Sequence, residues 1–139
     1  MKKIFFIILI SFFLIPVFAK SQDSSITHPE HPAEFPGGNK EWIHYLTHNL
    51  NRELGHTYLT IPKGEKNAKQ TVNLFFEIDT EGHTSNIVVE NLQEVHPALA
   101  KEGIRIIAES PAWKAASQNG KAVTDQRKQK ITFAIGSFP

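Results

Sequence analysis

The sequence predicts an α+β domain in which a small three-stranded antiparallel sheet carries helices on one face, with the element order α-β-β-α-β. Two observations support this fold class. Residues 72–78 alternate between core-type and surface-type positions, pass into a turn and lead to a second apolar run, which is the pattern of a β-hairpin. Apolar residues at helical spacing precede and follow this hairpin, and a third alternating segment comes after them.

The first element in chain order is a helix, which we expect to begin at Gly38 or Asn39, because asparagine suits the N-cap position. Its apolar stripe follows the helical period, at Trp42, Tyr45, Leu46 and Leu50. Gly55 is expected to mark the exit from this helix. After it, the sequence indicates a short extended piece over residues 58–61 and a polar loop over residues 65–70.

The hairpin is the clearest local signal in the chain. One face of its first strand carries Val72, Leu74, Phe76 and Ile78. Asp79-Thr80-Glu81-Gly82 predicts the turn, with glycine where φ is positive, and Ile87, Val88 and Val89 predict the second strand. Phe75 falls on the opposite face of the sheet. We expect Tyr58 and Leu59 to cover it, and a partner molecule is the alternative.

A second helix opens at His96-Pro97, since proline suits the first helical turn. One face of this helix carries Leu99, Gly103, Ile106 and Ile107, and the glycine allows a close approach to the sheet. Ser110-Pro111 ends the helix. Residues 112–123 are expected to form a loop that holds Trp113, and the last strand is predicted over residues 128–135.

The N-terminus has the order of a secretory signal peptide. Two lysines precede an almost wholly apolar run from Ile4 to Phe18, and Val17-Phe18-Ala19 offers a cleavage site. We therefore expect residues 1–19 to be a signal peptide and the protein to be periplasmic, with an uncleaved inner-membrane anchor as the alternative. Residues 20–36 contain three prolines and few aliphatic side chains, which predicts a flexible linker before a domain at residues 37–139.

Charge and cysteine content exclude several classes of protein. The chain has 15 Lys and Arg against 14 Asp and Glu, and without Lys2 and Lys3 the basic residues fall to 13. Since the chain after the signal is nearly neutral, nothing points to nucleic acid or to an anionic membrane surface as a partner. The chain has no cysteine, which rules out a disulfide framework, so the domain must be held together by burial of apolar surface.

Catalytic and metal chemistry have little support in the sequence. No cysteine, Gly-x-Ser-x-Gly turn or phosphate-binding glycine loop is present, so we expect neither an enzyme nor a cofactor. His44 and His48 lie one helical turn apart and would offer two ligands for Zn²⁺ if a third joined them. The glutamate that follows the first histidine in metalloprotease helices is missing. A solvated polar face is therefore the interpretation that we favour, and we predict no metal site.

Four segments resemble the C-terminal domain of the TonB family, in the form common in Bacteroidetes, and they occur in the family's order. They are Glu34-Phe35-Pro36-Gly37-Gly38, then Asp79-Thr80-Glu81-Gly82, then His96-Pro97-Ala98-Leu99 with Glu102, and finally Pro111-Ala112-Trp113-Lys114 followed by Gln118-Asn119-Gly120-Lys121-Ala122-Val123. The resemblance covers residues 34–138, nearly the whole predicted domain.

The resemblance implies a protein-binding domain that docks on a short segment of an outer-membrane receptor. In that family the receptor peptide adds as a strand beside the last strand of the domain, by β-augmentation. Carried over to this sequence, the edge is formed by Lys128, Gln129, Lys130, Ile131, Thr132 and Phe133. The alternative is a stand-alone envelope module that forms homodimers through the same edge.

Three departures from the family pattern bear on the role. The family's Tyr-Pro pair after the first helix is absent, with Ile61-Pro62 as the nearest equivalent, and alanine replaces the second proline of the Trp113 segment. An energy transducer also needs a retained anchor and a long spacer. The predicted linker of about 17 residues spans roughly 60 Å when fully extended. The sequence therefore supports a TonB-like fold better than energy transduction by this chain.

Overall fold

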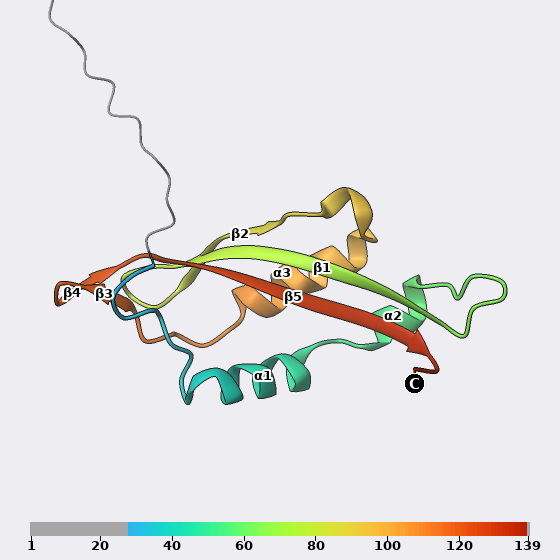
Figure 1. Cartoon of the computed structure of the whole chain (residues 1–139), viewed down its shortest axis with the longest axis horizontal. Coiled ribbons are helices and arrows are strands. Elements are labelled where there is room, and N and C mark those ends of the chain that lie inside the picture. The colour runs from blue at the N-terminus through green and yellow to red at the C-terminus, as the bar shows by residue number, and fades with distance from the viewer. Residues whose placement is uncertain (1–27, 139) are drawn as a thin grey trace, which may run out of the picture.

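The structure is a computed structural model that describes residues 28–138. Its elements follow one another as α1 (Gly38–Asn49), α2 (Glu53–Tyr58), β1 (Asn67–Ile78), β2 (Thr84–Val89), the short 3-10 helix η1 (Leu92–Glu94), α3 (Pro97–Ala108), β3 (Ala116–Gln118), β4 (Lys121–Val123) and β5 (Asp125–Gly136) (Figure 1). The predicted signal peptide lies outside the described residues. Within the described part, no helix is both long and apolar enough to cross a membrane.

The fold is α+β, and its main sheet has three antiparallel strands in the order β2-β1-β5, as the sequence predicts. All twelve residues of β1 pair with β5, from Asn67 opposite Gly136 to Ile78 opposite Asp125. Alternate residues of both strands are buried, which is the burial pattern of a sheet covered on one face. Helix α3 packs on β1 and β2, and Gly103 brings it close, because a Cβ there would lie 3.2 Å from Val72 and Leu74 side-chain atoms.

An aromatic cluster joins three segments that are far apart in the chain. Phe35, Trp42 and Trp113 come from the N-terminal segment, from α1 and from the segment before β3, and their ring centroids lie 4.9–5.3 Å apart. Tyr45 and Phe76 extend the cluster, with centroid distances of 5.6 and 6.2 Å to their neighbours. Aromatic pairs at such distances stabilise a fold beyond the area they bury. The cluster therefore seats α1 beside the sheet.

The end of the predicted linker belongs to the folded domain. Ala33 and Phe35 are buried in the core, and the backbones of His31 and Glu34 bridge to Ser117 and Lys114. The sequence did not indicate this, because these apolar residues are isolated among prolines and charges. The linker prediction is thus wrong for residues 28–36, while residues 20–27 lie outside the described part.

Helix α1 ends at Asn49, and Gly55 lies inside the separate helix α2, not at the exit of the first helix. The break after Asn49 is held by α3. Arg105 donates to the Asn49 carbonyl at 2.9 Å, and the buried carboxylate of Glu102 accepts from the Asn51 N–H at 2.8 Å. Because these tertiary bonds satisfy the groups at the helix end, the chain turns there without a glycine.

The other differences concern strand boundaries. Residues 58–61 are not an extended piece packed on the sheet as a unit, since Tyr58 ends α2 and stacks on His96 at 4.4 Å between ring centroids. Strand β1 begins at Asn67, inside the predicted polar loop, because β5 extends to Gly136 and offers partners for these residues. The predicted loop after Trp113 contains the hairpin β3–β4, whose turn residues Asn119 and Gly120 both have positive φ.

The turn of the main hairpin depends on Gly82. This residue has a φ of 90°, and its carbonyl accepts from the Trp113 N–H at 2.8 Å. A Cβ at this position would lie 2.0 Å from the Trp113 carbonyl oxygen, whereas a Cβ at Gly120 would meet nothing within 4 Å. Both glycines have a left-handed backbone conformation, so the two positions differ mainly in whether a Cβ would clash with the Trp113 carbonyl.

We predict that Gly82→Ala lowers the free energy of unfolding by at least about 3 kcal/mol, because the side chain pushes the Trp113 segment off the turn. The matched control Gly120→Ala should cost only about 1 kcal/mol, the price of a left-handed alanine. Urea denaturation followed by tryptophan fluorescence measures both values. Equal losses in the two variants would contradict the close packing of Trp113 on Gly82.

Candidate functional site

The outer edge of β5 is the site that the sequence singles out, and the hydrogen bonds around β1 establish which groups it exposes. Asn73 donates its N–H to Asn91 at 2.9 Å and accepts from the Glu90 N–H at 2.8 Å, so its backbone groups point toward β2. The direction of the backbone N–H and C=O groups alternates along a strand. Those of the neighbouring residues Val72 and Leu74 therefore point toward β5. The β5 residues opposite them are Ile131 and Gln129.

It follows that Lys128, Lys130 and Thr132 direct their N–H and C=O groups away from the sheet. These three are exposed, whereas Ile131 and Phe133 are buried on the helix-covered face and Gln129 is half-buried there. No strand within residues 28–138 pairs with this outer edge. The six predicted residues thus fall into two alternating sets of three. Lys128, Lys130 and Thr132 offer backbone groups, while Gln129, Ile131 and Phe133 turn their side chains toward the helices.

The opposite edge of the sheet is a poorer template for pairing. Strand β2 has six residues, its register with β1 shifts between Phe75 and Glu77, and Asn86 has a φ of 48°. Bulges and irregular backbone are devices that protect sheet edges from pairing. By contrast, β5 pairs with β1 in one unbroken register over its whole length. Of the two edges, β5 has the more regular backbone and is the better template for pairing.

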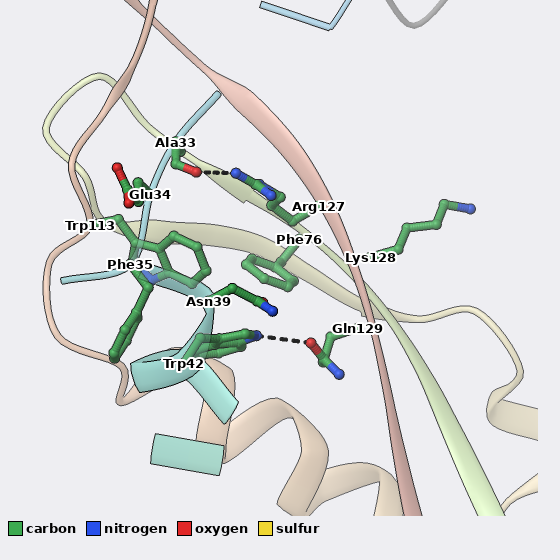
Figure 2. A pocket seen from close by; sticks show the side chains of 10 residues that line it. All are labelled: Ala33, Glu34, Phe35, Asn39, Trp42, Phe76, Trp113, Arg127, Lys128 and Gln129. Carbon is green, nitrogen blue, oxygen red and sulfur yellow. Dashed lines mark hydrogen bonds between the residues drawn. The ribbon is translucent and has the colours of Figure 1, made fainter. Parts of the chain in front are cut away.

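A groove accompanies the outer edge of β5, with α1 as its second wall. Its aliphatic part is a cavity of about 390 Å³ between residues 130–134 and the side chains of Leu46, Thr47, Leu50 and Arg52. Its aromatic part is a cavity of about 340 Å³ beside residues 127–129, where Trp42, Trp113 and Phe76 meet the polar side chains of Asn39 and Gln129 (Figure 2). An extended chain on the edge would therefore place alternate side chains in this groove.

The N-terminal segment limits the edge at the start of β5. The buried carboxylate of Asp125 accepts from the Ala33 N–H at 2.8 Å and from Arg127 Nε at 3.1 Å. Arg127 also donates to the Ala33 carbonyl and lies 5.8 Å from the Trp113 ring centroid (Figure 2). Both backbone groups of Ala33 are thus held by side chains of β5. This arrangement, the Asp125–Arg127 clamp, keeps the N-terminal segment beside the start of β5.

Phe75 lies on the face of the sheet away from the helices, as the sequence indicates. The structure places it with His28, Pro32 and the first residues of β5 around a cavity of about 350 Å³. The expected cover by Tyr58 and Leu59 is wrong, because Tyr58 stacks on His96 and Leu59 packs against the core. Within the described part of the chain, the N-terminal segment takes the place expected of these residues.

The position of the groove wall depends on an ion pair in α3 between the buried Glu102 and the partly exposed Arg105. Glu102 accepts from Arg105 at 2.7 and 2.8 Å and from the Asn51 N–H, and the Tyr45 hydroxyl donates to the Ile106 carbonyl at 2.9 Å. Burial raises the pKa of the Glu102 carboxyl, but the hydrogen bonds from Arg105 and Asn51 outweigh it, so its pKa is lowered. Burial also raises the pKa of Tyr45. These bonds hold the middle of α1 and the segment after its C-terminal end against α3.

His44 and His48 lie together on α1, but their arrangement has few of the properties of a metal centre. The rings of His44 and His48 stack at 3.8 Å between centroids, and His48 Nδ1 contacts the His44 carbonyl at 2.9 Å. Among residues 28–138, the one group of three possible ligand side chains is Asp79, Glu81 and His83 in the hairpin turn. Hydrogen bonds from backbone N–H groups, first that of His83, lower the pKa of Asp79. This carboxylate therefore already accepts hydrogen bonds within the turn.

No protein-family model, curated protein or solved structure matches the chain. The resemblance to TonB C-terminal domains therefore stays a prediction from sequence, and the candidate site stands on its geometry. The structure adds three features that sequence reasoning missed: the α1 wall of the groove, the Trp42–Gln129 hydrogen bond and the Asp125–Arg127 clamp. The helical stripe containing Leu46 and Leu50 indicated an inward face, but not that β5 leaves part of it uncovered.

We predict that Glu102→Gln reduces the free energy of unfolding by about 2 kcal/mol at pH 7, because a charged hydrogen-bond acceptor is lost beneath the groove wall. The lowered pKa of Glu102 means that its contribution is complete above the unfolded value of 4.5 and is lost as the pH falls through the folded value. The difference between wild type and variant should therefore shrink below pH 4.5.

Urea denaturation between pH 7 and pH 3 measures this difference. Glu109→Gln is the matched control, since it removes the exposed partner of the same arginine and should cost under about 1 kcal/mol. If the two variants lose equal stability at pH 7, the Glu102–Arg105 pair does not anchor α1.

Proposed function

We propose that this protein is a TonB-like periplasmic binding domain that recognises an extended peptide, such as that of a TonB-dependent outer-membrane receptor, by strand addition to β5. The observation that carries the proposal is the unpaired, regular outer edge of β5 beside the groove formed with α1. The proposed partner and the periplasmic location rest on the resemblance of four sequence segments to the TonB C-terminal domain. We propose no enzymatic role.

In this mode the backbone of the peptide supplies most of the attraction. Its N–H and C=O groups pair with those of Lys128, Lys130 and Thr132, each bond contributing about 0.5–1.5 kcal/mol. Alternate peptide side chains enter the groove, next to Leu46, Leu50 and Phe133 at the aliphatic end. The others lie on the exposed face next to the two lysines. Affinity thus comes from the edge and selectivity from the groove.

A second candidate is homodimerisation through the same edge, which the distribution of charge along β5 permits in some registers and opposes in others. If two copies pair antiparallel with Thr132 opposite its own equivalent, Lys130 faces Ala134 and no two lysines stand opposite one another. A register centred two residues closer to the N-terminus, on Lys130, would place this lysine opposite its own equivalent. Light scattering over a range of concentrations separates a monomer, which leaves the peptide as occupant, from a dimer.

We predict that Thr132→Pro weakens binding of peptides from the N-terminal segments of outer-membrane receptors by at least about tenfold. Proline removes the outward N–H and crowds the incoming strand, but it leaves the bonds to β1 intact, because Thr132 does not donate to β1. Calorimetry measures the dissociation constants, and circular dichroism checks the fold.

The matched control is Thr132→Val. Valine keeps the N–H and the β-branched shape and loses the hydroxyl that bonds Thr71 at 2.9 Å, so binding should stay within about twofold of wild type. If a folded Thr132→Pro variant binds these peptides as well as the valine variant does, peptide addition does not use the β5 edge.

A further inference from the structure

One side chain already occupies part of the edge that an added strand would use. Gln129 turns toward the helices, and its Nε2 reaches round to donate to the carbonyl of Lys130 at 2.8 Å. That carbonyl is one of the outward-pointing groups identified above. In the isolated protein, therefore, an amide N–H of the chain itself stands where the backbone N–H of a partner strand would arrive.

The amide of Gln129 is held in this orientation by α1. Its Oε1 accepts from Trp42 Nε1 at 2.9 Å, which leaves Nε2 as the end that faces the edge (Figure 2). Trp42 is only 6% exposed, and its indole stacks on Tyr45 and meets Trp113, so it cannot readily turn away. A buried indole N–H without an acceptor is costly. The tryptophan therefore keeps Gln129 in place, and Gln129 keeps the Lys130 carbonyl satisfied.

We infer that Gln129 is an edge latch: a positioning residue that imitates one hydrogen bond of an added strand and must be displaced, or must share its acceptor, when a strand pairs at Lys130. The latch protects the middle of the β5 edge against pairing with unselected strands, including a second copy of this chain. It deepens the proposed function and rests on it where the occupant is a peptide. Selectivity then includes the ability of a partner to replace the Gln129 bond.

The chain offers a close control for this residue. Gln126 lies on the same strand but on the exposed face, where its Nε2 contacts Glu77 at 3.3 Å and does not reach the outward carbonyls. Gln129→Met and Gln126→Met remove the amide with little change in length. Gln129→Glu and Gln126→Glu remove the donor but keep an acceptor. At position 129 the glutamate can still accept from Trp42, so this variant keeps the aromatic cluster satisfied if methionine unsettles it.

The test uses the second copy as the probe and sedimentation equilibrium as the measurement. Removing one hydrogen bond of the edge should tighten self-association of both Gln129 variants about two- to tenfold relative to wild type and to the Gln126 variants. Adding Thr132→Pro should abolish this increase. The indole N–H resonance of Trp42 should shift in Gln129→Met and stay hydrogen-bonded in Gln129→Glu, with Trp113 as internal reference.

Equal association constants in wild type and Gln129 variants, including the case in which all stay monomeric at the highest concentration, would overturn the latch. So would an increase that survives Thr132→Pro, because the association would then lie elsewhere. Failure of the proposed function is a separate result. A chain whose Gln129 variants dimerise through the edge, but which binds no receptor peptide, has the latch and not the peptide role.

Discussion

The pairing of β1 with β5 is the constraint on which the rest of the structure depends. Twelve residue pairs in one register fix which side chains face the core and which backbone groups face outward. A shift of one residue would turn one strand over relative to the other and expose the buried residues of that strand. Because the buried set includes Val72, Leu74 and Phe76, which are at most 1% exposed, the hydrophobic cost of such a shift is prohibitive. The register in turn determines the composition of the free edge.

In the proposed function, the free edge is selective only because α1 lies beside it at a fixed distance. Two independent anchors hold this helix. The aromatic cluster around Trp42 seats its beginning, and the bonds from Glu102 and Arg105 to the backbone after Asn49 hold its end. The first anchor reaches the sheet through Phe76 of β1, and the second comes from α3. The width of the groove is therefore set by aromatic packing that also lines it and by charge pairing that lies outside its lining.

Much of the fold follows from local patterns in the sequence, and the exceptions have a common cause. The strand around Leu74, the turn at Gly82 and the helix opened by Pro97 are confirmed, because alternation, turn chemistry and capping act over a few residues. The break at Asn49, the burial of Phe35 and the start of β1 at Asn67 depend on partners 50 to 90 positions away or on the length of the partner strand. No local pattern contains that information.

The same limit applies to the candidate site. The alternation of Lys130, Ile131 and Thr132 predicts which side chains are buried, but it does not say on which side β5 lacks a neighbour. The resemblance to the TonB family supplied that edge, and the hydrogen bonds of Asn73 show which of its groups are outward. The Trp42–Gln129 contact joins residues 87 positions apart and has no signature in either local segment.

The two edges of this sheet illustrate how a small protein can keep one edge usable without exposing it fully. Edge β2 is protected by its own irregular backbone, which prevents pairing permanently. A protein that binds by strand addition cannot treat β5 in that way, because a bulge would remove the template. A side chain that satisfies one outward carbonyl achieves a reversible form of protection. A partner strand must replace one hydrogen bond, and this cost is small compared with the several hydrogen bonds of a ladder. Every strand that pairs at this position meets the same cost. Protection of this kind favours partners that also fill the groove, since only they recover more than the exchange costs.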